Sequence, residues 1–117
     1  MALRDRLTER VTPLLEPGEQ VRHVFPAQAG VNPWIGNLLG LLGQTFVRRR
    51  IVAVTDQHVV VLGATLNGTK PTKVLHRLPR TRIGPTKGIW SSIQLAGEKT
   101  WVHARYRGEV EGADAGL

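Results

Sequence analysis

The chain lacks cysteine altogether, and this absence excludes two kinds of small scaffold. None of its 117 residues is a cysteine, so neither a disulfide framework nor a thiolate-ligated metal site can form. Aromatic residues are also scarce, at 5%, whereas hydrophobic residues make up an ordinary 41%. A chain of this length buries about two thirds of its unfolded surface on folding. We therefore expect one self-sufficient domain, with an amphipathic helix at 1–16 leading into a sheet domain at 17–117.

Long uninterrupted apolar runs are missing as well. The longest apolar stretch, residues 31–46, is broken by one proline and three glycines, and it is shorter than the roughly 20 residues of a membrane-spanning helix. Charged residues within the first ten positions interrupt any apolar core of a signal peptide. We therefore expect a cytoplasmic protein that could touch the inner face of the membrane but not cross it. For residues 31–45 the sequence predicts either a short helix that is weakened by its glycines or an exposed loop.

Acidic residues are few in the middle of the chain. Against 16 lysines and arginines the chain has 9 acidic residues, for a net charge of +7, and residues 46–107 contain only Asp56 and Glu98. The resulting positive field favours anionic partners such as nucleic acid, acidic protein or phospholipid headgroups. Arginine outnumbers lysine twelve to four. That bias suits bidentate capture of phosphate or carboxylate, and it is equally what a GC-rich genome would encode.

The usual combinations of catalytic or metal-binding residues are not found in the sequence. The only two serines, Ser91 and Ser92, occur in a predicted strand, without the context of a nucleophile elbow. The four histidines fall in separate segments, and no glycine-rich loop ends in the Gly-Lys-Ser/Thr of a nucleotide cradle. We therefore expect no catalytic residues, no metal ligands and no cofactor, and a protein that is not an enzyme.

Hydrophobic periodicity predicts one helix, six strands and a closing helix. A spacing of apolar residues typical of helices covers residues 2–15, and period-2 patterns predict strands at 21–27, 46–55, 58–64, 72–78, 88–95 and 99–103. Most of these strands are joined as hairpins, and a helix follows from about residue 103. In the last hairpin we expect Trp90 and Trp101 to face each other. This order is typical of a mainly β (α+β) fold, a small antiparallel sheet curled into a half-open barrel.

Three stretches resemble a known family. They are "LEPGEQVRHVFPAQAG", the hairpin "RRRIVAVTDQHVVVL" and the closing "WVHARY" with the acidic helix after it. Together they resemble small bacterial proteins, of the actinobacterial type, with a pleckstrin-homology-like (GRAM-like) domain. The resemblance implies a non-enzymatic domain of two roughly orthogonal sheets closed by a C-terminal helix, and homo-oligomers in some relatives. Eukaryotic relatives bind phosphoinositides near the loop between the first two strands.

Two basic groups are the candidate contact sites. The run Arg48-Arg49-Arg50 opens a predicted strand just after the apolar stretch that contains Trp34. Alternation along a strand puts Arg48 and Arg50 on one face and Arg49 on the other. The run can therefore also be read as a solvated strand end that discourages aggregation. A looser basic series begins at Lys70 and Lys73. The candidate contact residues are Trp34, Arg48, Arg49, Arg50, Lys70 and Lys73.

The sequence thus leaves two classes of function open from its residues, and a third, a carrier of a small ligand in the mouth of the barrel, from the fold class alone. The first is a non-catalytic interaction module that acts through a protein partner, through homo-oligomerisation or at an anionic membrane surface. The second is a basic, nucleic-acid-binding β-barrel, which the charge of the central segment favours and the small number of aromatic residues does not.

Overall fold

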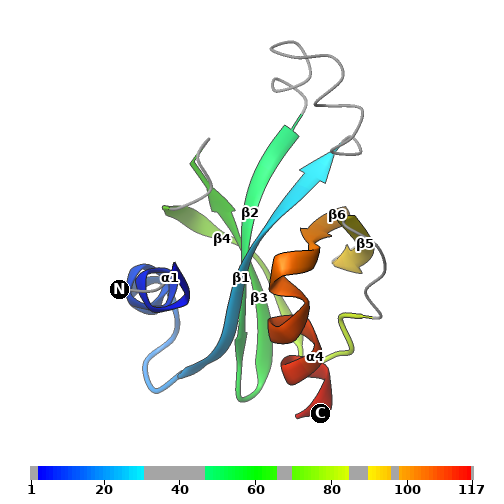
Figure 1. Cartoon of the computed structure of the whole chain (residues 1–117). Helices are drawn as coiled ribbons and strands as arrows, with labels where there is room; N and C mark the ends of the chain where they lie inside the picture. Colours follow the sequence, from blue (N-terminus) through cyan, green and yellow to red (C-terminus); the bar gives the residue numbers. More distant parts are fainter. Residues whose placement is uncertain (1–2, 31–46, 66–69, 85–89, 96–97, 117) are drawn as a thin grey trace.

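The computed structural model describes residues 3–30, 47–65, 70–84, 90–95 and 98–116. They form two short α-helices, two 3-10 turns and six strands (Figure 1). The helical segments are α1 (Leu3–Val11), the turn η1 (Thr12–Leu14), the turn η2 (Ala104–Tyr106) and α4 (Arg107–Ala115). The strands are β1 (Val21–Gly30), β2 (Val47–Thr55), β3 (His58–Ala64), β4 (Pro71–Pro79), β5 (Trp90–Leu95) and β6 (Glu98–His103). The chain is therefore mainly β, and the predicted strands all form, with ends shifted by up to three residues.

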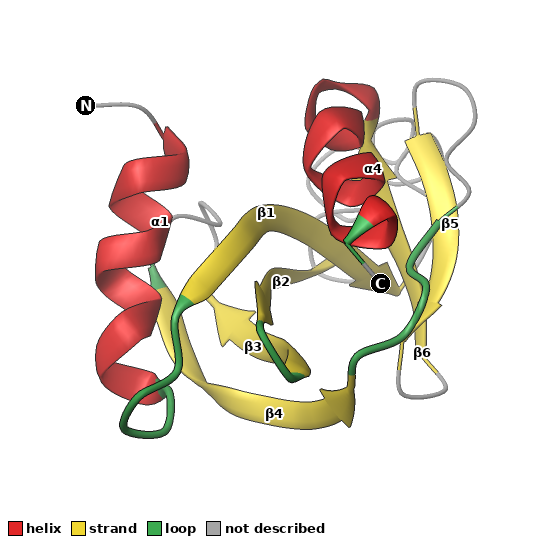
Figure 2. Cartoon of the chain, turned by 90° about the horizontal axis from the view of Figure 1, so that it is seen from below, coloured by secondary structure: helices red, strands yellow, loops and turns green. Residues whose placement is uncertain are grey.

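The six strands make one antiparallel sheet in the order β4-β3-β2-β1-β6-β5. β1 pairs with β2 from Val21 to Gly30, and it pairs with β6 only at Gln28 and Ala29. β1 is therefore the strand that joins the hairpins β2-β3-β4 to the hairpin β5-β6. The sheet is curled rather than flat (Figure 2).

Both faces of the sheet are covered where the apolar runs Ile51–Val54 of β2 and Val59–Leu62 of β3 lie, which explains why these runs do not alternate with polar residues. On one face Phe25, Val52 and Val61 belong to a buried cluster that includes Val110 and Ala113 of α4. On the other face α1 places Leu7 and Val11 in a second cluster, against alternate residues of the same strands (Val24, Ile51, Ala53, Val60, Leu62). α1 and α4 accordingly lie on opposite sides of β1 (Figures 1 and 2).

The first helix is shorter than predicted. The α-helix ends at Val11 and continues as the turn η1, because Pro13 has no N–H to donate and its ring clashes with the carbonyl one turn earlier. Leu7 and Val11 are buried as the periodicity predicts, whereas Leu14 is 37% exposed. The expectation of a continuous helix over residues 2–15 was therefore wrong at its C-terminal end.

The first strand is longer than predicted, although it contains Pro26. Pro26 pairs with Ile51 of β2, and pairing with β6 begins only at Gln28. Pro26 therefore lies where β1 has a single neighbour, which is the kind of edge position at which a sheet tolerates proline. The strand continues to Gly30 instead of ending near Ala27.

The last hairpin has a different register from the predicted one. Leu95 pairs with Glu98, so His103 lies opposite Trp90, and Ser92 lies opposite Trp101. The prediction that Trp90 and Trp101 face each other was wrong, because a shift of one or two residues at the turn changes every pair along the hairpin. The buried face of β5 carries Ser91, Ile93 and Leu95, and Trp90 belongs to the opposite face.

Neither α1 nor α4 is long and apolar enough to cross a membrane, and no other helix occurs among the described residues. The stretch 31–45, predicted to be a helix or a loop, lies outside them.

Candidate functional site

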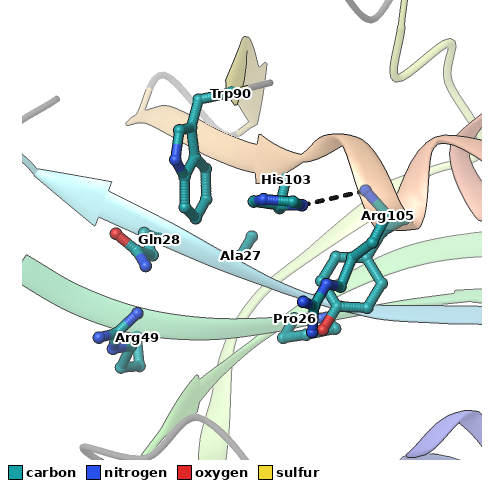
Figure 3. Close-up of a pocket in the computed structure, with 8 residues that line it drawn as sticks. Pro26, Ala27, Gln28, Arg49, Trp90, His103 and Arg105 are labelled. Atoms are coloured by element: carbon teal, nitrogen blue, oxygen red, sulfur yellow. Dashed lines mark hydrogen bonds between the residues drawn. The ribbon is translucent and has the colours of Figure 1, made fainter. Parts of the chain in front are cut away.

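A pocket of about 280 Å³ opens where β1 meets β2, β5 and β6 (Figure 3). β1 contributes one wall, β2 contributes Arg49, and the end of β6 with the turn η2 contributes the opposite wall. We call it the Trp90–Arg105 pocket, and its lining residues are Pro26, Ala27, Gln28, Arg49, Trp90, His103, Arg105 and Tyr106. Residues from four separate parts of the sequence therefore meet at one place.

The register of the sheet sets the position of each lining side chain. Gln28 is opposite Arg49 on one side of β1 and opposite Trp101 on the other. Trp90 is opposite His103 in the last hairpin. Because strands alternate, Arg49 belongs to the face that carries Ile51 and Ala53, which α1 covers farther along β2. Arg49 therefore enters the pocket from the α1 side of the sheet, whereas Ala27 and Tyr106, which also line it, belong to the cluster on the α4 side.

Aromatic contacts fix the wall formed by the last hairpin. The rings of Trp90 and His103 lie edge to face, with centroids 4.9 Å apart and planes at 90°. Nδ1 of His103 accepts a hydrogen bond of 3.1 Å from the backbone N–H of Arg105, which caps the turn η2. A neutral His103 therefore carries its proton on Nε2. The geometry favours a rigid wall, because both ring planes are held by neighbours.

The charge of the pocket has one sign. Arg49 is half-buried, Arg105 is exposed, and none of the eight lining residues is acidic. The guanidinium of Arg105 also lies over the ring of Tyr106, 6.0 Å from its centroid. Figure 3 shows Arg49 and Arg105 in different parts of the pocket, with Gln28 and Ala27 near its middle. Two guanidinium groups and a histidine suit a carboxylate or phosphate, which arginine binds through paired N–H donors.

A further cation lies next to the pocket on the same face of β6. The ammonium of Lys99 is 4.9 Å from the centroid of the Trp101 ring, a cation–π contact at an exposed position. Nε1 of Trp101 is buried and has no hydrogen-bond partner in the described part of the chain. The face formed by Lys99, Trp101 and His103 thus extends the positive charge of the pocket along the last hairpin.

Among the residues that it describes, the structure does not bring the candidate contact residues predicted from the sequence together at one site. Arg49 lines the pocket, whereas Arg50 belongs to the opposite face of β2 and donates to the carbonyl of Arg49 at 3.1 Å. Arg48 pairs with Ala29 in the sheet, but its side chain and the whole of Trp34 lie outside the described residues. Lys70 lines a different hollow, beside Arg10 and Leu14, and Lys73 is exposed on β4 at the far edge of the sheet.

Of the eight residues that line the pocket, only Arg49 was predicted from the sequence as a contact residue, and the missed residues include Trp90, His103 and Arg105. Trp90 was expected to face Trp101, His103 was considered only as one of four histidines in separate segments, and Arg105 lies within the basic central segment without being singled out. The detectable signal was the alternation of Trp101, His103 and Arg105 along one strand end. Their meeting with Arg49 depends on the pairing of β1 with β6, which no local pattern reveals.

A second polar cluster, the Glu19 network, ties the opposite end of the sheet together. Oε1 of Glu19 accepts a hydrogen bond of 2.6 Å from Nη1 of Arg77, and Oε2 accepts one of 3.1 Å from the hydroxyl of Thr55. Nδ1 of His58 lies 3.3 Å from the same Oε2. Burial raises the pKa of Glu19, but the bonds from Arg77, from the Glu16 N–H and from Thr55 together outweigh it and hold the pKa below its ordinary value. This network links the segment before β1 to β2 and β4 through hydrogen bonds, and to β3 through His58, whose Nδ1 lies near Glu19 without a hydrogen-bond partner in the described part of the chain.

The structure shows where the two serines lie and how the potential metal ligands are grouped. Among the described residues no group of three or more histidines and acidic residues could hold a metal ion. Ser91 is buried on the covered face of β5, and Ser92 pairs with Trp101 across the hairpin. The Trp90–Arg105 pocket provides positive charge beside an aromatic wall, an arrangement that suits an anionic group.

Comparison with known proteins adds no relative: the chain matches no protein-family model, no curated protein and no solved structure.

Proposed function

We propose that this chain is a non-catalytic interaction module with a pleckstrin-homology-like fold, and that it recognises an anionic group on a partner protein in the Trp90–Arg105 pocket. The observation that carries the proposal is the composition of the pocket: two arginines and a histidine beside an aromatic wall, with no acidic lining residue. Binding sites for small groups are concave and combine a few placed polar groups with aromatic walls.

The finer fold in this proposal is a half-open barrel of two roughly orthogonal sheets. It is supported by the limited pairing of β1 with β6, at Gln28 and Ala29 alone, next to the full-length pairing of β1 with β2. A strand shared in this way is the corner strand of such a barrel. The burial of Val110 and Ala113 of α4 in the cluster of Phe25 and Val102 also agrees with a closing C-terminal helix.

A protein partner fits the described surface better than a membrane does. Peripheral membrane proteins combine cations with apolar side chains that insert into the lipid. Of the described large apolar side chains, only Leu14 is exposed, and it lies in the hollow with Lys70 rather than beside Arg49. The contacts of the pocket fit a carboxylate-bearing side chain that is presented by a folded or extended partner.

Nucleic acid fits the pocket less well for a different reason. Single-strand binders present successive open aromatic faces on which bases stack. Trp90 instead meets His103 edge to face, and the ring of Trp101 is covered by the ammonium of Lys99. The positive charge of the central segment still favours weak, salt-sensitive binding of any polyanion.

The test uses a glutamate-rich peptide of about ten residues as the probe, titrated by calorimetry at about 0.15 M salt. Arg105→Glu changes an exposed lining cation, and we expect binding to weaken by about tenfold or more, a loss of about 1.4 kcal/mol. The matched control is Lys73→Glu, the same charge change on the far edge of the sheet, and we expect less than a twofold effect. In parallel, we would measure binding of the protein to phosphatidylglycerol vesicles and to a single-stranded oligonucleotide. Light scattering of the protein alone would give its oligomeric state.

Three results would overturn the proposal. The first is no detectable binding of the peptide. The second is an equal loss in Arg105→Glu and Lys73→Glu, because binding would then follow net charge rather than the pocket. The third is tighter binding of the vesicles or the oligonucleotide than of the peptide, which would transfer the function to that partner.

A further inference from the structure

The two edges of the sheet differ in chemistry. β4 forms one edge, begins and ends with proline at Pro71 and Pro79, and carries Lys73 and Arg77 between them. β5 forms the other edge, and its sequence WSSIQL contains neither a charged residue nor a proline. Charges and prolines on an edge prevent further strands from pairing with it. β4 is thus protected against strand addition by its own sequence, and β5 is not.

The free side of β5 has no paired strand among the described residues, since its only partner in the sheet is β6. A strand added there would lie about 4.8 Å from β5 and bond to its outward N–H and C=O groups. Alternate side chains of that strand would share the face of Trp90 and Ser92. These positions are next to the basic face of β6, where Lys99 lies opposite Gln94 and His103 opposite Trp90.

Charge complementarity determines the occupant. The cations nearest to that edge are Lys99 on β6 and Arg105 in the turn after it, whereas Arg49 is on β2, farther from β5 in the strand order. A second copy of this chain would bring another neutral β5 and another net charge of +7, so two copies repel each other at long range. An extended segment with acidic side chains at alternate positions instead pairs its backbone with β5 and its carboxylates with the cations.

We propose that β5 accepts an extended, acidic segment of a partner protein as an additional strand, with carboxylates of that segment directed toward Lys99 and Arg105 at the margin of the Trp90–Arg105 pocket. This inference rests on the proposed function and names the shape of the partner. The pocket supplies the charge recognition, and the edge of β5 supplies the backbone hydrogen bonds that a single anion cannot make.

The experiment compares two forms of one probe with the whole chain. The first is a peptide of about ten residues that alternates glutamate and valine, so that all carboxylates lie on one face of a strand. The second has the same sequence with N-methyl groups at alternate backbone nitrogens, which leaves the carboxylates intact and prevents pairing with an edge. We expect the first to bind about tenfold or more tightly than the second. We also expect it to slow amide hydrogen exchange within β5 and not within β4.

A pair of protein variants separates the two edges. Ser92→Glu places a negative charge at an exposed position of β5, and His76→Glu places one at an exposed position of β4. We expect the first change to weaken peptide binding severalfold and the second to leave it within twofold, because repulsion acts at the docked strand. Circular dichroism of both variants checks that the sheet is intact.

The outcomes distinguish this inference from the proposed function. Equal binding of both peptides, sensitive to Arg105→Glu but without protection of β5, overturns strand addition and leaves anion recognition in the pocket standing. Protection of β4 in place of β5 overturns it, and so does a dimer of the chain that forms without peptide and blocks the edge. Failure of both peptides to bind overturns both proposals.

Discussion

Single side chains connect distant segments of this small domain, and Glu19 is the clearest case. Its carboxylate is 12% exposed and is held by Arg77 and Thr55, which come from different strands. Glu16 lies near the same arginine, but its side chain is 64% exposed and its Oε1 is 3.7 Å from Nε of Arg77. Two acidic residues three positions apart therefore differ in what they contribute, because one is shielded and hydrogen-bonded and the other is solvated.

Glu19→Gln is expected to lower the free energy of unfolding by about 1–2 kcal/mol, since the neutral amide weakens the charged bond to Arg77 and offers one acceptor oxygen in place of two. Glu16→Gln is the matched control and is expected to change it by less than about 0.5 kcal/mol. Urea denaturation midpoints of both variants and the parent protein give the comparison. Equal effects would mean that the Glu19 network does not stabilise the fold.

Two glycines of α4 are expected to respond in opposite directions to alanine. A Cβ at Gly112 would lie 2.7 Å from Cε1 of His23, whose Nδ1 is 3.1 Å from Oε2 of Glu109, whereas a Cβ at Gly108 would meet nothing within 4 Å. Gly108→Ala is expected to raise the free energy of unfolding by about 0.5–1 kcal/mol through helix propensity. Gly112→Ala gains the same propensity, but displacing His23 costs about 1–3 kcal/mol. Thermal unfolding of the pair measures the difference, and a more stable Gly112→Ala would show that His23 moves freely.

At the scale of elements, hairpins could be predicted from the sequence, and their contacts could not. Valine-rich alternation and the Thr55–His58 turn are local signals, and they identified β2 and β3 within one residue. Pro13 shortened α1, and Pro26 was accommodated because β6 joins β1 only at Gln28. The Trp90–Arg105 pocket depends on that same long-range pairing. Arg49 could therefore be nominated from its sequence, while Trp90 and His103 could not.

α4 is fastened at its C-terminal end by contacts from the segment after β4. Nη2 of Arg80 donates to the carbonyl of Ala113 at 2.7 Å, and its Nη1 donates to the carbonyl of Thr55 at 3.0 Å. A cation at this end also complements the helix dipole. The carboxylate of Asp114 accepts two hydrogen bonds from the backbone: Oδ1 from the N–H of Ile83 at 2.7 Å and Oδ2 from the N–H of Gly84 at 2.8 Å. Ala113 and Asp114 therefore attach the C-terminal end of α4 to the segment after β4.

Asp114→Asn is expected to release one of these two N–H groups, because an amide has one acceptor oxygen where the carboxylate has two. We expect a loss of about 1–2 kcal/mol in the free energy of unfolding and faster amide exchange at Ile83 and Gly84. Glu111→Gln, at an exposed position of the same helix, is the control and should leave both unchanged. Unaltered exchange at Ile83 and Gly84 in Asp114→Asn would contradict this role.

At the scale of the whole molecule, negative charge is scarce and is used in specific contacts. The chain carries 9 acidic residues against 16 basic ones. Glu19, Asp56, Glu109 and Asp114 each contact a basic group or backbone N–H groups from another part of the chain. Protonating Glu19 and Asp56 weakens their hydrogen bonds to arginine, which lower the pKa of Asp56 and, against the effect of burial, that of Glu19, and it also increases the net positive charge of the chain. Acid therefore acts on this fold in two ways at once.

The stability of the protein is accordingly expected to fall in acid. The bonds from Arg77, from the Glu16 N–H and from Thr55 lower the pKa of Glu19 against the effect of burial, and the bond from Arg22 lowers the pKa of Asp56. A carboxyl group with a lowered pKa stabilises the folded state above its ordinary pKa, and that contribution disappears as the pH falls through the lower value. We expect a level urea midpoint above about pH 5 and a steep decline below it.

Glu19→Gln identifies the contribution of one group to this decline. The variant cannot take up a proton at that position, so its stability is expected to start lower at neutral pH and to fall less steeply between about pH 5 and pH 3. The stability of Glu16→Gln should fall with decreasing pH at the same slope as the stability of the parent protein. If all three curves remain parallel, the acid sensitivity arises from the net positive charge of the molecule and not from the Glu19 network. Added salt then distinguishes the two causes, because it screens self-repulsion more than it weakens a bond shielded from water.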